Sequence, residues 1–172
     1  SDIKEVEIID SKKISESSFE KLDIENAKYL HIAAHGIHSK KDPNYSGILL
    51  GEPLDSKNKD GILQKHEIFS LNLNADLVTL STCFSGFGEI DPNEGNLGIY
   101  RSFLIGGAKS VIISLWDVND KATSLFFNKF YDYLLDGNSK PESLRLTREY
   151  LKNNTPYKHP AYWAPFILIG ES

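Results

Sequence analysis

Three short and almost wholly apolar runs constrain the fold more than any other feature of the chain. They are residues 28–34 (KYLHIAA), 76–82 (DLVTLST) and 109–116 (KSVIISLW). Runs this short and this continuously apolar are typical of strands that are buried on both faces, as in a parallel sheet. Because parallel neighbours need long crossover connections, the pattern also predicts helices between the strands.

The segments between and after these runs have the spacing of amphipathic helices. Apolar residues recur every three or four positions in residues 94–108, 120–137 and 139–154. The pair Gly106-Gly107 predicts the end of the first helix, and Ser139 predicts the N-cap of the third. The chain is therefore predicted to be an α/β protein, with a mainly parallel sheet covered by helices on both faces in a three-layer α/β/α sandwich.

Shorter segments complete the expected order of elements. Strands are predicted at residues 5–9, 47–51 and 163–170, with a hairpin around the second and an edge or entry position for Pro165 in the third. Short helical segments are predicted at residues 15–22 and 64–69.

Length and composition restrict the class of protein. The 172 residues fit one domain, 1–172, and a net charge of −5 argues against contacts with the phosphates of nucleic acids. No apolar run reaches the roughly 18–20 residues of a membrane span, and a single cysteine fits a reducing compartment such as the cytosol. The absence of methionine suggests an excised piece of a longer protein.

A histidine and the only cysteine follow two of the predicted strands. His35 and Gly36 come after the first run, and Cys83 comes after the second. Ligands of open α/β sheets bind beyond the carboxyl ends of the strands, so this edge is where a site is expected. A thiol needs a base or a positive field to act as a nucleophile, and an imidazole supplies the base and can protonate a leaving amine. The amides of Gly36 and Cys83 would then form an oxyanion hole.

Simpler interpretations of the same residues remain open at this point. A cysteine that ends an apolar strand is most often inert core, and a His-Gly pair is usually a turn. His31 and His35, four positions apart on one predicted strand, would share a face with His38 nearby. Zinc generally needs three or four converging ligands, so neither a metal nor any other cofactor is expected.

Four motifs in a fixed order carry a resemblance to a known family. HIAAHG, LVTLSTCFSGFG, EGNLGIYRSFLIGGAKSVIISLWDVND and HPAYWAPFILIG together resemble the CHAT domain, over about residues 28–170. CHAT domains are caspase-like cysteine peptidase domains related to separase, and they often follow tetratricopeptide repeats. The resemblance therefore implies that the chain is the C-terminal part of a longer protein and that it lacks the first strand of the domain. The resemblance implies the caspase–hemoglobinase fold and a cysteine endopeptidase with His35 and Cys83 as the catalytic dyad.

The resemblance also implies where substrate binds. SLWDVNDKATS resembles a tryptophan-aspartate motif of separase, so Trp116, Asp117 and Asp120 are expected near the pocket for the residue before the cleaved bond. Ser81 lies where metacaspases carry an aspartate that binds basic residues, so a preference for arginine is not implied. Asp120 has a competing prediction as the N-cap of the helix that follows it.

Partners and alternatives follow from the same resemblance. A protein or peptide substrate is expected, with gating by upstream repeats or by an activating protein, and no contact with nucleic acid or a membrane. A scaffold domain that keeps the dyad without turnover, and a thiol acyl-transfer enzyme acting on a non-protein substrate, are the alternatives.

Overall fold

The computed structural model describes residues 14–19, 21–37, 45–51, 60–81 and 97–172. Its elements are, in chain order, α1 (Glu16–Phe19), η1 (Ile24–Asn26), β1 (Tyr29–Ile32), β2 (His35–Ile37), β3 (Gly47–Leu49), β4 (Ile62–Gln64), α2 (Lys65–Ile68), β5 (Leu77–Leu80), α3 (Leu97–Ile105), β6 (Ser110–Ser114), α4 (Asp120–Leu135), α5 (Lys140–Asn154), η3 (Pro160–Tyr162) and β7 (Phe166–Gly170). The strand predicted at residues 5–9 lies outside the described residues. No helix in the described ranges is long and apolar enough to cross a membrane.

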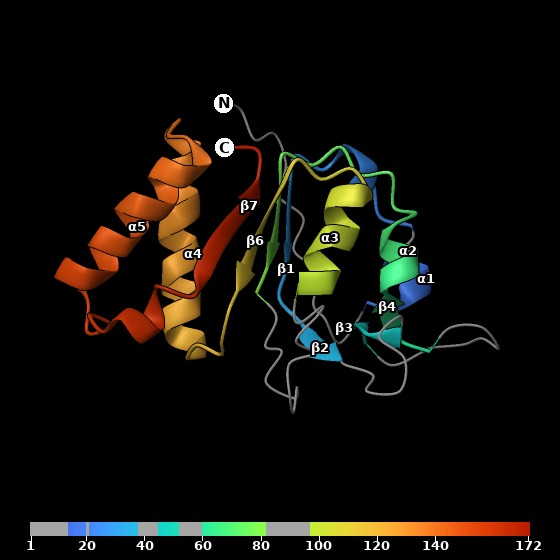
Figure 1. Cartoon of the computed structure of the whole chain (residues 1–172), viewed down its shortest axis with the longest axis horizontal. Helices are drawn as coiled ribbons and strands as arrows, with labels where there is room; N and C mark the ends of the chain where they lie inside the picture. The colour runs from blue at the N-terminus through green and yellow to red at the C-terminus, as the bar shows by residue number, and fades with distance from the viewer. Residues whose placement is uncertain (1–13, 20, 38–44, 52–59, 82–96) are drawn as a thin grey trace.

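The larger sheet is mainly parallel, as predicted. Its strands lie in the order β1-β5-β6-β7; β1, β5 and β6 run parallel, and β7 pairs antiparallel with β6 (Figure 1). The run at residues 76–82 becomes β5, in which all four side chains are buried, and the run at 109–116 becomes β6. Among the described strands, β7 lies at an edge of this sheet, directly after Pro165, which confirms the edge position expected there.

Helices lie against both faces of this sheet. Alternate side chains of β5 and β6 point to opposite faces, because the side-chain period of a strand is two. Val78 and Val111 belong to a core cluster with Phe103 of α3, whereas Leu77 and Ile112 belong to a second cluster around Phe126 of α4. Figure 1 shows α4 and α5 on one side of the sheet and α3 on the other.

The first apolar run was expected to be buried on both faces, and this prediction is wrong. β1 covers only Tyr29–Ile32, and within it His31 is exposed while Ile32 alone is buried. The reason is position: among the described strands, β1 lies at the edge of the larger sheet and pairs only with β5. An edge strand is covered less completely than a central one.

A second, small sheet holds the hairpin region. β2, β3 and β4 form an antiparallel sheet in the order β2-β3-β4, which confirms a hairpin around residues 47–51. β2 begins at His35, three residues after β1 ends, so the chain passes from one sheet into the other at that point. Ile48 and Leu63 of this sheet are buried in the same cluster as α3.

The start of α5 and the end of α3 lie at the predicted residues. Ser139 Oγ accepts the backbone N–H of Glu142 at 3.4 Å, and Ser15 Oγ accepts that of Ser18 at 3.2 Å. After α3, Gly107 has φ +107°, and a Cβ there would lie 2.0 Å from the carbonyl oxygen of Leu73. Only glycine allows this left-handed and tightly packed turn, so it ends α3 where the sequence predicts.

Candidate active site

The carboxyl ends of three parallel strands meet at one edge of the larger sheet. Ile32 at the end of β1 pairs with Leu80 at the end of β5, and Leu80 pairs with Ile113 of β6. The amide of Ser81 donates to the carbonyl oxygen of Ile32 at 2.9 Å, so the residue after β5 is tied to the end of β1. His35, Ser81 and Trp116 follow these strand ends, so the fold brings the predicted site segments to a common edge.

The backbone of His35 and Gly36 is held in the small sheet. His35 pairs with Leu49 and Gly36 pairs with Ile48, which is fully buried. The His35 side chain is exposed. Strand pairing therefore fixes the backbone of this histidine while its ring stays accessible to a substrate.

Cys83 lies outside the described residues, but the register of the two strands before it is described. Each residue of β1 pairs with the residue 48 positions later in β5. His35 and Cys83 are also 48 positions apart, and each comes three residues after the end of its strand.

Trp116 is connected to the segment that precedes the last strand. Its indole N–H donates to the carbonyl oxygen of Ala161 in η3 at 3.0 Å, and the amide of Leu115 donates to that of Pro165 at 3.1 Å. Trp116 remains 46% exposed. A partly exposed indole held by a hydrogen bond can contact a ligand without reorienting. The link between Trp116 and η3 was not predicted, because no sequence rule pairs residues 45 positions apart.

The two predicted carboxylates are both exposed, and one prediction about them is wrong. Asp120 is not the N-cap of α4; Asn119 is, and its Oδ1 accepts the amides of Lys121 at 3.1 Å and Ala122 at 3.4 Å. A capping oxygen must come from the residue before the first helical one, and Asp120 already has helical backbone. Asp117 and Asp120 are therefore both solvent-facing beside the strand ends.

Replacement of Asn119 and of Asp120 should distinguish the residue that caps α4 from the one that only interacts with the helix dipole. We expect Asn119→Ala to lower the free energy of unfolding by about 1 kcal/mol, because two amides lose their acceptor. Asp120→Ala should cost about 0.5 kcal/mol or less, since only its favourable interaction with the helix dipole is lost. Chemical denaturation of both variants measures the difference, and a larger loss for Asp120→Ala would restore it as the cap.

His31 does not share a face with His35, which is a second correction. The two histidines lie in different sheets, because β1 ends before His35. The His31 ring packs against α4, with ring centroids 4.9 Å from Phe127 and 5.7 Å from Tyr131. Loss of water around the ring lowers the pKa of His31 to about 4. His31 thus has a packing role, and His38 lies outside the described residues.

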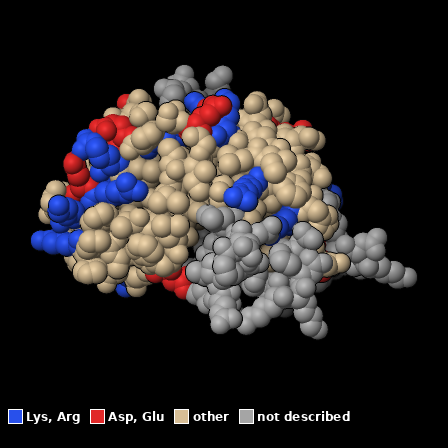
Figure 2. Space-filling model, in the orientation of Figure 1, with Lys and Arg blue, Asp and Glu red and all other residues tan. Residues whose placement is uncertain are grey.

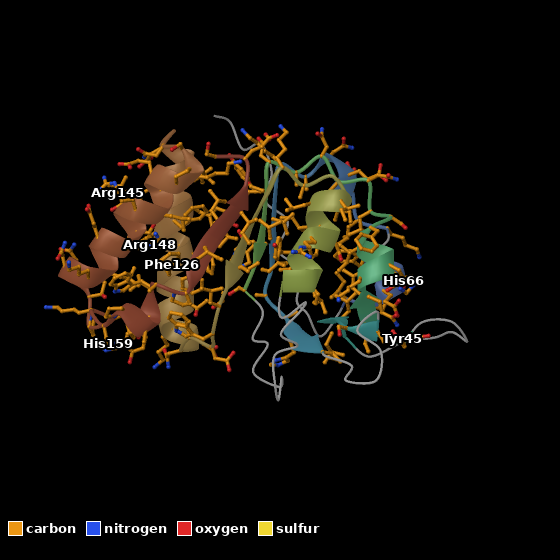
Figure 3. All side chains as sticks on the ribbon, in the orientation of Figure 1. Tyr45, His66, Phe126, Arg145, Arg148 and His159 are labelled. Atoms are coloured by element: carbon orange, nitrogen blue, oxygen red, sulfur yellow. The ribbon has the colours of Figure 1, made fainter. Side chains whose placement is uncertain are left out.

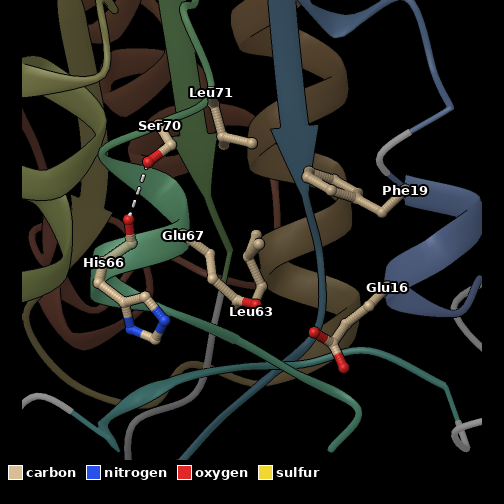
Figure 4. A pocket seen from close by; sticks show the side chains of 7 residues that line it. All are labelled: Glu16, Phe19, Leu63, His66, Glu67, Ser70 and Leu71. Carbon is tan, nitrogen blue, oxygen red and sulfur yellow. Dashed lines mark hydrogen bonds between the residues drawn. The ribbon is translucent and has the colours of Figure 1, made fainter. Parts of the chain in front are cut away.

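The described surface also contains a pocket of about 260 Å³ away from these strand ends (Figure 4). It lies between α1 and α2, and its lining residues are Glu16, Phe19, Leu63, His66, Glu67, Ser70 and Leu71. None of the predicted site residues lines it. The strand-end arrangement, not this pocket, is therefore the candidate active site.

Comparisons with known proteins support the resemblance to the CHAT family. A model of the CHAT domain family matches residues 3–171. Tetratricopeptide repeat protein 28 of Mus musculus is 32% identical over 109 residues, and that of Homo sapiens is 30% identical over 109 residues. These matches cover 63% of this chain and 4% of the length of each relative.

Proposed function

Because this chain belongs to the CHAT domain family, we propose that it is a caspase-like cysteine endopeptidase in which His35 and Cys83 form the catalytic dyad. The mainly parallel sheet with helices on both faces supports the caspase–hemoglobinase type of three-layer α/β/α sandwich as its architecture. The two relatives are named for tetratricopeptide repeats, so their names do not supply this activity.

The observation that carries the proposal is the register of β1 and β5. Parallel strands paired with an offset of 48 residues end at the same level, and the hydrogen bond from the Ser81 amide to the Ile32 carbonyl closes the last of these pairs. His35 and Cys83 have the same offset in the sequence. We therefore expect the thiol and the imidazole to lie near each other beyond these strand ends, as a dyad requires.

The proposed chemistry uses side chains and amides only. The Cys83 thiolate attacks the scissile carbonyl carbon, and the amides of Gly36 and Cys83 stabilise the oxyanion that forms. His35 donates a proton to the leaving amine, which breaks the peptide bond and leaves an acyl-enzyme. His35 then takes a proton from water as it attacks the acyl carbon, and the thiolate is released. No metal or cofactor takes part.

Substrate would lie along the rim formed after β5 and β6. Ser81 follows β5, while Trp116 and the exposed carboxylates of Asp117 and Asp120 follow β6. The partial exposure of Trp116 supports a contact with the side chain before the cleaved bond. Hydrogen bonding to η3 would keep this indole in place while substrate binds.

Restraint of the peptidase is proposed to come from elsewhere in a longer protein or from a partner. The relatives contain tetratricopeptide repeats by name, and this chain matches only 4% of their length. A repeat domain or an activating protein would then gate access to the dyad in the cytosol. Contacts with nucleic acid or membranes are not part of the proposal, since the chain carries a net charge of −5.

Covalent labelling tests the dyad directly. We expect a peptide with a C-terminal chloromethyl ketone to alkylate Cys83, because the ketone mimics the scissile carbonyl and places its carbon next to an activated thiolate. Intact-mass spectrometry and peptide mapping would locate the adduct. Iodoacetamide serves as the control for mere accessibility of the thiol, and the peptide reagent should react at least about tenfold faster.

Two outcomes would contradict the proposal. A folded protein that never reacts at Cys83, with any upstream repeat domain present, would favour a scaffold domain. Hydrolysis of small amides without cleavage of any peptide in a library would favour a different thiol acyl-transfer enzyme. Assays with a peptide library and with small amides, run on the same protein, distinguish these two outcomes: a scaffold domain hydrolyses neither, and the acyl-transfer enzyme hydrolyses only the amides.

A further inference from the structure

The outer edge of β7 has backbone groups that no described strand pairs with. β7 is the last of the described strands in its sheet, and its pairing with β6 is antiparallel. The amide of Leu115 donates to Pro165, and that of Glu171 donates to Lys109. Because hydrogen-bonded and non-bonded pairs alternate, the N–H and C=O groups of residues 166, 168 and 170 point away from β6.

Arg148 of α5 lies at one end of this edge. One of its terminal nitrogens donates to the carbonyl oxygen of Phe166 at 2.6 Å, which accounts for one of the outward-facing groups. Its Nε is buried and has no hydrogen-bond partner within the described structure. Partial burial desolvates this guanidinium and lowers the pKa of Arg148, and no anion among the described residues compensates. A carboxylate is the group that would complete its hydrogen bonding.

The rest of this edge is apolar. Ile167, Leu168 and Ile169 each pack against one of the two core clusters, yet each remains half-buried. Figure 2 shows the corresponding face, where residues without charge dominate between the charged groups on α5 and those near α3. A strand edge with apolar side chains and few charges lacks the usual protection against pairing with another strand.

From these observations we propose that the outer edge of β7 binds an extended peptide strand that carries a carboxylate opposite Arg148. Leu168 and Gly170 would supply main-chain hydrogen bonds, and the apolar side chains of β7 would contact alternate residues of the peptide. The partner is thus an acidic and otherwise apolar extended segment. This binding does not depend on the dyad. The edge is nevertheless connected to the candidate site, because Phe166 pairs with Ser114 at the end of β6, two residues before Trp116.

Peptide binding to the 172-residue chain tests the proposal. The probe is a fluorescent eight-residue peptide of alternating valine and threonine with one terminal glutamate. The control peptide is identical except that glutamine replaces the glutamate. We expect the glutamate peptide to bind with a Kd in the high micromolar range, about fivefold or more tighter than the glutamine peptide. Fluorescence anisotropy measures both, and amide chemical-shift changes at Leu168 and Gly170 locate the site.

Three variants make the test specific. Arg148→Met should remove the difference between the two peptides. Arg145 lies on the same helix (Figure 3), and Arg145→Met should leave the difference unchanged, because Arg145 pairs with Glu142 and Glu149. Leu168→Pro should abolish binding of both, since it removes an outward N–H without breaking the ladder to β6. Thermal unfolding would verify that each variant is folded.

Several results would overturn the proposal. Equal binding of the two peptides would exclude the carboxylate, and absence of binding at millimolar peptide would exclude strand addition. A concentration-dependent dimer that Leu168→Pro dissolves would assign the edge to a second copy of this chain instead of a peptide. Shifts confined to residues outside β7 and α5 would place binding elsewhere.

Discussion

Peptide cleavage should fall by at least about a thousandfold when Cys83 is replaced by alanine, with the fold intact. Alanine removes the only cysteine sulfur in the chain, and with it the one thiol that can form an acyl-enzyme. The measurement is kcat/KM on a peptide selected by cleavage profiling of the full-length parent protein. Circular dichroism and thermal unfolding would show whether the variant remains folded.

His35 provides the second half of the same prediction. His35→Ala should cause a loss of similar size, because a thiol without its base is mostly protonated and the leaving amine lacks its acid. The double variant should lose little more than either single one, since residues that act as a unit are not additive. Lys152→Ala, an exposed position on α5, serves as the control and should retain activity.

The opposite outcome has a clear structural meaning. If Cys83→Ala cleaves as fast as the unchanged chain but unfolds at a lower temperature, the cysteine is a core residue and the dyad is wrong. Retained cleavage in His35→Ala alone would point to another base near the strand ends.

The central strands and the long helices could be predicted from sequence because their patterns are local. A continuous apolar run such as 76–82 needs cover on both faces wherever it lies, and it becomes the fully buried β5. The three-and-four spacing in residues 120–137 likewise determines which side of α4 meets the sheet. Ser139 and Gly107 act on neighbouring amides or on their own backbone, so their effects on helix ends are also local.

Features that depend on strand order could not be predicted in the same way. His31 was expected on a strand covered on both faces, but β1 lies at an edge of the larger sheet as described. Nothing within residues 28–34 distinguishes an edge position from a central one. Asn119 and Asp120 are both good capping residues, and only the point at which the backbone becomes helical decides between them.

The candidate site depends both on local sequence patterns and on the order of the strands. The sequence places His35 and Cys83 after two apolar runs, while their proposed meeting depends on β1 and β5 being adjacent, parallel and offset by 48 residues. The hydrogen bond between Trp116 and Ala161 joins segments 45 residues apart and required the fold to be known. The catalytic roles themselves stay a prediction that the Cys83 and His35 variants test.

Phe126→Ala should lower the free energy of unfolding by about 3–5 kcal/mol, far more than the loss of a helix cap. Phe126 is fully buried between α4 and the sheet, and its ring centroid lies 4.3 Å from that of Phe166 and 5.4 Å from that of Phe127. Alanine removes the ring and leaves a cavity that aromatic neighbours held by the sheet and the helix fill only in part.

Chemical denaturation measures this loss, and the midpoint of thermal unfolding should fall by about 10 °C. Leu135→Ala is the matched control, because Leu135 lies on the same helix and is 40% exposed; it should cost about 1 kcal/mol or less. Phe126→Leu should fall between the two, since leucine fills part of the space. Equal losses for Phe126→Ala and Leu135→Ala would mean that α4 does not pack on the sheet through Phe126. A different face of α4 would then have to pack against β7.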